Sequence, residues 1–397
     1  MTANASPPRI PRTVWALGFV SLFMDVSSEL VHSLLPAFMV GTLGMGMLTV
    51  GLIEGVAEAT ALTVKVFSGA LSDYLGRRKA LLLLGYGLAA LSKPLFPLAH
   101  SLELVLGARL LDRLGKGIRG APRDALIADV APPAIRGACF GLRQSMDTAG
   151  AFLGPLLAIL LMLCSGANVG AVLWFAVLPA LLCVAMLAFG VVEPERAPAA
   201  RRFRAPIHVA ALRRFAPAYW WVVAIGAVFT LARFSEAFLV LRAQQLGVPI
   251  SWVPLVMVVM AACYMLSAYP VGHWSDRVGR HRLLGVGLLL LVLADLLLAR
   301  AGSVAAVLLG VALWGLHMGF TQGLLATLVA DTTPAELKGT AFGLFNLVSG
   351  VALLLASGLA GALWQAHGAA STFHAGALFA GLALLLLLLR RRAARDR

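Results

Sequence analysis

The stretch G-A-L-S-D-Y-L-G-R-R-K, from Gly69 to Lys79, lies between two long apolar runs. A related stretch, G-H-W-S-D-R-V-G-R-H-R, runs from Gly272 to Arg282. Their glycines, aspartates and basic residues share one offset of 203 residues. The matching pairs are Gly69/Gly272, Asp73/Asp276, Gly76/Gly279, Arg77/Arg280 and Lys79/Arg282. A fixed offset of about half the chain indicates an internal duplication.

A second pair of motifs extends the duplication. Ala128-Asp129-x-x-Pro132 matches Ala330-Asp331-x-x-Pro334 at an offset of 202 residues. Shortly after them, Arg136-Gly137 matches Lys338-Gly339. The two halves therefore repeat in the same order along the chain.

The composition indicates a polytopic membrane protein. Of the 397 residues, 60% are hydrophobic and 13% are charged, and the mean hydropathy is +0.90. A soluble domain carries about twice that share of charged residues. The net charge of +14 is compatible with a nucleic-acid partner. We expect none, because the basic residues occupy short loops between apolar runs, and we expect a lipid bilayer instead.

We predict twelve membrane-spanning helices, since each span needs about 20 mostly apolar residues. The fold class is then all-α, with two six-helix bundles related by a pseudo-two-fold axis along the membrane normal and a binding site between them. We place the N-terminal bundle at 1–192, a cytoplasmic linker at 193–216 and the C-terminal bundle at 217–397. The predicted spans are 14–36, 46–69, 80–98, 102–123, 137–161, 169–191, 218–241, 250–271, 283–299, 303–327, 340–363 and 371–389.

The basic residues predict the orientation. Nearly all basic residues outside the spans lie on one side of the membrane in this arrangement of spans. Arg242 and Arg300 are the main basic residues on the other side. The positive-inside rule then places both termini and the linker in the cytoplasm, for a multi-pass protein of the cytoplasmic (inner) membrane. The first span is not followed by a small-residue cleavage site, so we expect it to remain as a membrane helix.

Ionisable residues inside the spans predict function, because charges in a membrane usually face a cavity or a partner. Asp25, Glu29 and His32 share one helix face, and Glu58 lies deep in the second span. We interpret these four as candidates for proton coupling. The first three also suit a divalent metal, but no further ligands accompany them, so we expect neither a metal site nor another cofactor. The candidates for the substrate cavity are Glu54, Asp112, Arg113, Arg143, Asp147, Arg233, Glu236, His317, Gln322 and Asn346.

Several of these residues have a purely structural alternative. Arg143 with Asp147, and Glu58 with Lys65, are equally well explained as neutralising pairs. For His317 on an apolar helix, a packed and hydrogen-bonded histidine is the slightly favoured interpretation. The cysteines lie in apolar runs without ligand spacing, which is typical of buried thiols.

On these motifs the chain resembles the major facilitator superfamily over nearly its whole length. Gly69, Asp73, Gly76, Arg77 and Arg78 match the signature loop of that superfamily. Arg109 or Arg113 with Gly117 is similar to its fourth-span arginine motif. Gly150-x-x-x-Gly154-Pro155 is similar to an antiporter motif of the fifth span, although Leu157-Ala158 replaces its final glycines.

The resemblance implies transport by alternating access, with loops at the cytoplasmic end that break and re-form contacts. The implied gate consists of Gly69, Asp73, Gly76, Arg77, Arg78, Asp129, Arg136, Asp276, Gly279 and Arg280. A plain positive-inside anchor is the structural alternative for these loops.

We weigh three functions. The first is a monomeric, proton-coupled secondary transporter that exports a small organic compound by antiport. The second is a proton-coupled importer of an organic anion, a metal or a metal chelate, which the arginines Arg113, Arg143 and Arg233 favour. The third, a membrane enzyme or a receptor, is disfavoured because the sequence has no nucleophile motif, zinc motif or nucleotide-binding loop.

Overall fold

The computed structural model describes residues 9–194, 212–334 and 337–395, with side chains at 275–276 and from 390 onward outside the description. The described residues form long helices joined by short turns, as the apolar runs predict. The first bundle comprises α1 (Arg12–Gly41), α2 (Met47–Leu75), α3 (Arg78–Ser92), α4 (Leu102–Val130), α5 (Arg136–Cys164), α6 (Val169–Phe175) and α7 (Val177–Gly190). The second comprises α9 (Pro217–Ala232), α10 (Ala237–Gln245), α11 (Leu255–Val278), α12 (Arg280–Arg300), α13 (Val304–Asp331), α14 (Lys338–His367) and α15 (Ala369–Arg395).

Ten of the twelve predicted spans, taking α6 with α7 and α9 with α10 as one span each, are long and apolar enough to cross a membrane by length and composition alone. The exceptions are α3, which has only 15 residues, and α4, which carries many charged side chains. Both belong to the first bundle, where α4 packs against α2 and α3. Arg109, Asp112 and Arg113 on α4 are buried there, so protein rather than lipid surrounds these charges.

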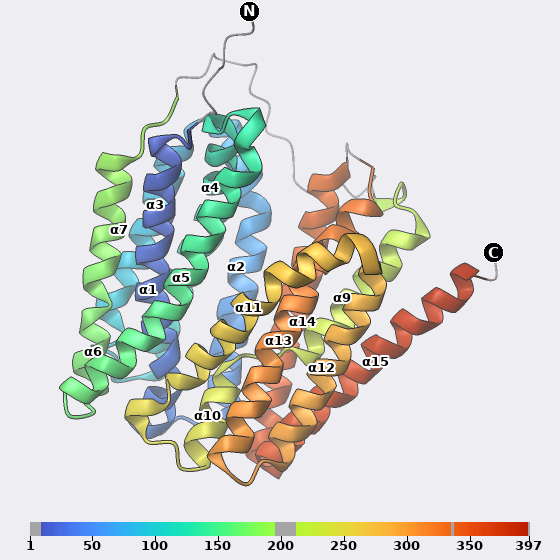
Figure 1. Cartoon of the computed structure of the whole chain (residues 1–397). Helices are drawn as coiled ribbons and strands as arrows, with labels where there is room; N and C mark the ends of the chain where they lie inside the picture. The colour runs from blue at the N-terminus through green and yellow to red at the C-terminus, as the bar shows by residue number, and fades with distance from the viewer. Residues whose placement is uncertain (1–8, 195–211, 335–336, 396–397) are drawn as a thin grey trace, which may run out of the picture.

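The two bundles lie side by side and meet through symmetry-related helices (Figure 1). Helix α2, the second span, packs along α14, the eleventh span. Helix α5, the fifth span, packs against α11, the eighth span. A two-fold axis that exchanges the bundles turns the first contact into the second, as the duplication predicts. The division at 193–216 stays a prediction, because residues 195–211 lie outside the described residues.

Glycines allow a close approach between the bundles towards the end at which α1 ends and α2 begins (Figure 1). A Cβ atom at Gly51 would lie 2.2 Å from the Ser357 carbonyl oxygen, and one at Gly361 would lie 2.4 Å from the Met47 carbonyl oxygen. The Leu48 amide donates a hydrogen bond to the Gln365 side chain across the same contact, at 3.2 Å. Small residues therefore hold α2 and α14 together at that end.

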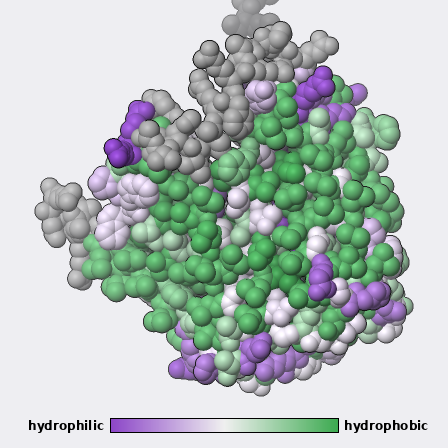
Figure 2. All heavy atoms as spheres, turned by 180° about the vertical axis from the view of Figure 1, so that it is seen from behind, coloured by the Kyte–Doolittle hydropathy of each residue, from purple (hydrophilic) through white to green (hydrophobic). Residues whose placement is uncertain are grey.

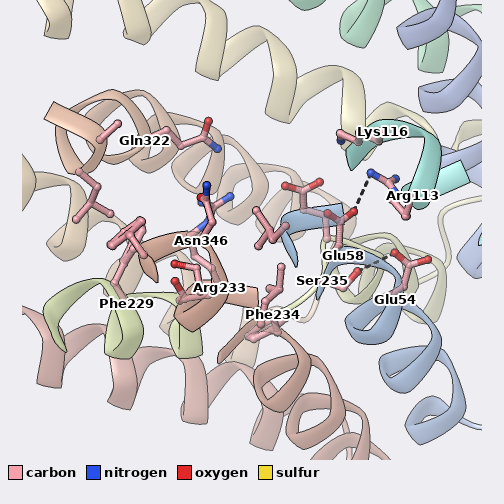
Figure 3. A pocket seen from close by; sticks show the side chains of 18 of the residues that line it. Glu54, Glu58, Arg113, Lys116, Phe229, Arg233, Phe234, Ser235, Gln322 and Asn346 are labelled. Carbon is pink, nitrogen blue, oxygen red and sulfur yellow. Dashed lines mark hydrogen bonds and ion pairs between the residues drawn. The ribbon is translucent and has the colours of Figure 1, made fainter. Parts of the chain in front are cut away.

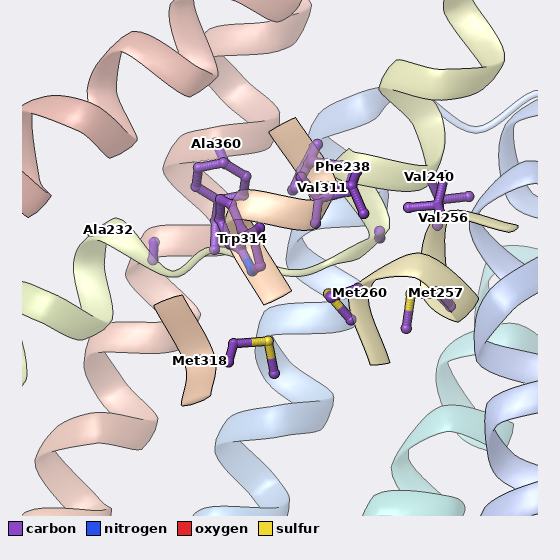
Figure 4. Packing of buried hydrophobic residues seen from close by; sticks show 14 of the residues in the cluster. Ala232, Phe238, Val240, Val256, Met257, Met260, Val311, Trp314, Met318 and Ala360 are labelled. Carbon is purple, nitrogen blue, oxygen red and sulfur yellow. The ribbon is translucent and has the colours of Figure 1, made fainter. Parts of the chain in front are cut away.

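Apolar side chains cover most of the face seen in Figure 2, while hydrophilic residues gather towards its ends. This distribution fits a molecule surrounded by lipid over its middle. Inside the second bundle, Trp314 is buried among apolar residues that include Met260 and Met318 (Figure 4). Arg242, one of the two exceptions to the basic-residue asymmetry, donates hydrogen bonds to the Leu298 and Ala301 carbonyl oxygens at the end of α12.

Candidate functional site

A cavity of about 520 Å³ lies between the bundles (Figure 3). The first bundle contributes side chains from α1, α2 and α4, and the second from α9, α13, α14 and the segment between α9 and α10. The volume is typical of a site for a small organic molecule. Its wall combines Glu29, His32, Glu54, Glu58, Arg113, Lys116, Arg233 and Glu236 with uncharged residues such as Phe229, Thr230, Phe234, Ser235, Gln322, Phe345, Asn346 and Ser349.

The seventh span is broken where it passes the cavity. Helix α9 ends at Ala232 and α10 begins at Ala237, and Arg233, Phe234, Ser235 and Glu236 between them are not helical. Such a break is tolerated within a membrane protein where it lines a cavity and finds other hydrogen bonds. Here the Ser235 amide donates to the Ser357 hydroxyl at 3.1 Å, and the Ala237 amide donates to the Ser235 hydroxyl at 3.2 Å.

Glu54 on the cavity wall belongs to a fully buried ion pair within the first bundle. The Arg109 guanidinium donates to both carboxylate oxygens of Glu54, and the Nε to Oε1 distance is 2.9 Å. Two-point contact of this kind is the strongest geometry for an arginine and a carboxylate. Each charge offsets the other, which a pair in a membrane interior requires.

His32 joins this pair to a second carboxylate. Its Nε2 atom lies 3.6 Å from Glu54 Oε2, and its Nδ1 atom lies 3.4 Å from Glu29 Oε2. Both Glu29 and His32 line the cavity, so a proton can reach them from its solvent. Glu29, His32 and Glu54 form a chain of titratable groups that leads from the cavity to the buried ion pair. We call these three residues and Arg109 the Glu54 cluster.

One contact connects this cluster to the other bundle. The Ser235 hydroxyl, in the break of the seventh span, donates to Glu54 Oε2 at 3.4 Å. Glu54 therefore contacts α1 through His32, α4 through Arg109 and the second bundle through Ser235. A change in its charge would act on the contact between the bundles.

Two more ion pairs stiffen α4. Arg113 Nη1 lies 2.9 Å from Glu58 Oε1 on the cavity wall. Behind it, the buried Lys93 ammonium donates to Asp112 at 2.7 Å and to the Ser28 hydroxyl at 2.9 Å. Glu58 thus pairs with Arg113 on a neighbouring helix, and the suggested pairing with Lys65 is wrong.

The structure brings most of the predicted site residues together. Nine of them line the cavity: Glu29, His32, Glu54, Glu58, Arg113, Arg233, Glu236, Gln322 and Asn346. Four predicted cavity residues do not: Asp112, Arg143, Asp147 and His317. Asp112 is turned towards Lys93, and Arg143 pairs with Asp147 within α5. His317 is fully buried, with its Nδ1 against the Trp314 carbonyl and its ring against Phe229 and Trp314.

Asp25 also lies away from the cavity, in a second ionic cluster nearer the end at which α1 begins. Its Oδ1 atom lies 4.0 Å from Arg119, whose guanidinium stacks over the Tyr86 ring at 4.6 Å. In the same cluster, Arg123 donates to Ser21 at 2.9 Å and to Asp147 at 3.3 Å. The cluster therefore joins α1, α3, α4 and α5 within the first bundle.

The loop that links α2 to α3 is tied to its own bundle. Helix α2 continues to Leu75, so Gly69 and Asp73 lie in its last turns, and Gly76 ends it with a φ of +62°. The buried Arg78 side chain lies 3.1 Å from Asp129 and 3.6 Å from Asp73. Of the other basic gate candidates in this bundle, Arg77 and Arg136 are exposed.

The second copy repeats this arrangement. Gly279, with a φ of +88°, separates α11 from α12, and Arg280 forms an ion pair with Asp331. Asp331 is the duplicate of Asp129. In each half, a basic residue after the loop therefore pairs with the aspartate at the end of the equivalent helix, α4 or α13. The side chain of Asp276 lies outside the described residues.

Glu193, which follows the end of α7, forms hydrogen bonds with the backbone after the loop between α2 and α3. Its carboxylate accepts hydrogen bonds from the Arg78 amide at 2.6 Å and the Lys79 amide at 3.1 Å, at the start of α3. We predict that Glu193→Ala lowers the stability by about 1–2 kcal/mol, because α3 loses its N-terminal cap. Thermal unfolding of the purified protein in detergent measures this, and an unchanged midpoint would contradict it. Glu193→Gln retains one acceptor and should lose less.

Sequence reasoning missed several residues of the site. Lys93, Lys116 and Ser235 are not among the predicted site residues. A lysine inside an apolar run and the cluster R-F-S-E inside the seventh span were the available signals. In the described part of the chain, no group of three or more histidine, cysteine, aspartate or glutamate side chains could hold a metal ion.

Comparison with known proteins identifies a family. Residues 17–266 and 231–397 match the family model of the Major Facilitator Superfamily. The chain is 31% identical over 392 residues to the uncharacterized MFS-type transporter MJ1317 of Methanocaldococcus jannaschii, covering 97% of this chain and 96% of the relative. It is 26% identical over 360 residues to the multidrug resistance protein MdtH of Salmonella arizonae, covering 88% and 82%.

Two solved structures share the fold. A POT family transporter in complex with 5-aminolevulinic acid superposes with a TM-score of 0.81 at 13% identity, covering 97% of this chain and 96% of the other. A bacterial homolog of the human lysosomal transporter Spinster, in an inward-facing and occupied conformation, superposes with a TM-score of 0.77 at 16% identity, covering 99% of both chains. At these identities the likeness concerns the fold alone.

Proposed function

The chain belongs to the Major Facilitator Superfamily, and we propose from that premise that it exports a small organic compound in exchange for protons by alternating access. The cavity between two symmetry-related bundles supports this proposal, because such transporters bind substrate between their repeats. The similarity to a multidrug resistance protein supports the outward direction. The basic loops support an orientation with both termini in the cytoplasm.

The observation that carries the proton coupling is the Glu54 cluster. Glu29, His32 and the fully buried Glu54 line the cavity, and Ser235 of the second bundle contacts Glu54. Histidine normally changes charge near neutral pH, so His32 is suited to accept a proton from the cavity. A proton on His32 or Glu29 changes the field at Glu54, and therefore the strength of its contacts with Arg109 and Ser235.

This arrangement links proton binding to the movement of the bundles. A ligand shifts a conformational equilibrium only when it binds the two conformations with different affinity. We expect the proton to bind the two conformations with different affinity, because the contact between Glu54 and Ser235 requires that the bundles meet beside Glu54. We infer that separation of the bundles removes the contact and changes the proton affinity of the cluster.

Glutamine at Glu29 and Glu58, two of the four glutamates that line the cavity, tests the coupling. We expect Glu29→Gln and Glu58→Gln to reduce accumulation driven by a pH gradient, since an amide cannot carry the proton. Exchange of labelled for unlabelled substrate, which needs no net proton movement, should remain. Proteoliposomes with an imposed gradient measure both, and the coupling fails if both variants accumulate substrate like the unmodified protein. An acidic interior drives uptake by antiport, whereas an acidic exterior drives it by symport.

The second candidate function is proton-coupled import of an organic anion. Cavity cations without a protein partner favour an anionic substrate, and the sign of the gradient that drives uptake distinguishes import from export. Import of a free metal ion has less support, because the residues that the structure describes include no suitable ligand group.

A further inference from the structure

Most charged side chains of the cavity wall already have a partner. Glu54 pairs with Arg109, Glu58 pairs with Arg113, and Glu29 contacts His32. Each of these carboxylates is matched by a nearby cation or hydrogen-bond donor. The groups that remain are the ones available to a substrate.

Two cations remain, one from each bundle. Lys116 on α4 is exposed to the cavity, and within residues 9–194, 212–334 and 337–395 it makes no ion pair. Arg233, in the break of the seventh span, makes none in that same part of the chain, and its buried Nε atom has no hydrogen-bond partner. A buried arginine Nε atom without a hydrogen-bond partner is costly unless a ligand or water supplies an acceptor.

The surroundings of Arg233 suit an acidic group attached to an apolar body. Figure 3 shows Asn346 beside Arg233 on one wall and Lys116 on the opposite side. Amide groups can donate further hydrogen bonds to a carboxylate. The Phe229 ring lies 5.8 Å from the Arg233 guanidinium, and Phe345 lines the same cavity. Aromatic rings offer an apolar surface to the rest of such a molecule.

We propose that the substrates are organic monoanions whose acidic group binds between Lys116 and Arg233 and whose apolar body packs against the phenylalanines. This inference rests on the proposed transport function and names its substrate class. Glu236 on the same wall also makes no described ion pair, and its negative charge opposes a second acidic group. Monoanions are therefore preferred over dianions.

The position of the two cations also relates binding to closure. Lys116 and Arg233 belong to different bundles and line the same cavity. An anion that contacts both adds an attraction to each bundle, so it favours the arrangement in which the bundles approach. A neutral molecule of the same shape lacks this effect.

Equilibrium dialysis of the purified full-length protein against three probes of one shape tests the proposal. The probes are 1-naphthoate, 1-naphthamide and 1-naphthylmethylamine, which are anionic, neutral and cationic. We expect naphthoate to bind about tenfold more tightly than either analogue, and Lys116→Gln and Arg233→Gln each to weaken it about tenfold or more. Naphthalene-1,4-dicarboxylate should bind more weakly than naphthoate.

Lys65→Gln is the matched control. The Lys65 stem packs against Gly120, one helical turn from Lys116, but Lys65 does not line the cavity. The proposal is overturned if naphthoate does not bind, or if either analogue binds as tightly as naphthoate. It is also overturned if Lys116→Gln, Arg233→Gln and Lys65→Gln all bind naphthoate with the same affinity. Failure of the transport function gives a different result, in which naphthoate binds as predicted but no pH gradient moves it across a proteoliposome membrane.

Discussion

Replacing Arg109 with leucine is expected to abolish transport and to lower the free energy of unfolding by about 3–5 kcal/mol. Arg109 neutralises the fully buried Glu54 through two contacts, and Lys93 already pairs with Asp112. Without Arg109, the Glu54 carboxylate must stay charged and unpaired in the membrane interior or hold a proton permanently. Either outcome disables a cluster that has to change its charge during the cycle.

The double variant Arg109→Leu/Glu54→Gln separates stability from coupling. It removes both charges, so we expect it to recover most of the lost stability, because the main cost of the single variant is the unpaired carboxylate. It should still fail to couple transport to protons. Chemical unfolding in mixed micelles measures the first effect and proteoliposome flux the second. If the single and double variants are equally unstable, the pair contributes through packing rather than charge.

Replacing Gly51 with leucine is expected to push the bundles apart at the end where they now meet. A Cβ atom there would lie 2.2 Å from the Ser357 carbonyl oxygen, which belongs to the backbone and cannot move aside alone. Overpacking of this kind costs about 1–3 kcal/mol, which shifts an equilibrium about 5- to 150-fold. The population of the closed arrangement should fall accordingly, and transport should slow because one half of the cycle is disfavoured.

Spin labels on His100 and Arg300 measure that population in a cysteine-free protein. Both positions are exposed; His100 precedes α4 and Arg300 is the last residue of α12, and both lie at the end where the bundles meet. Gly51→Leu should lengthen the distance between the labels. Gly107→Leu is the control, because no neighbouring atom lies within 4 Å of a Cβ there. A distance distribution that Gly51→Leu leaves unaltered would show that this contact does not determine the closed arrangement.

The duplication predicted the architecture because it is a property of the chain itself. The offset between Asp73 and Asp276 required two equivalent bundles, and the paired contacts α2–α14 and α5–α11 confirm them. The glycines of the signature loop were also interpretable from sequence, since Gly76 and Gly279 adopt the positive φ that the turn needs.

The partners of the buried charges were harder to predict, because pairing depends on how neighbouring helices slide and rotate against one another. Helix periodicity placed Glu58 and Lys65 on one stripe of α2, yet Glu58 pairs with Arg113 on α4. For the same reason, the ion pair between Lys93 and Asp112 could not be predicted from the sequence. The break at Ser235 contains neither proline nor glycine, so the sequence offered no common helix-breaking residue from which to predict it.

The central claim is that the proton occupancy of the Glu54 cluster governs the contact between the bundles. The most direct measurement is the distance between labels on His100 and Arg300, recorded from about pH 5 to pH 8.5 around the ordinary titration range of histidine. We predict that acidification separates the bundles at this end in the unmodified protein. Glu54→Gln should make the distance independent of pH in that range. A distance that does not change with pH in the unmodified protein, or that changes identically in Glu54→Gln, would contradict the claim.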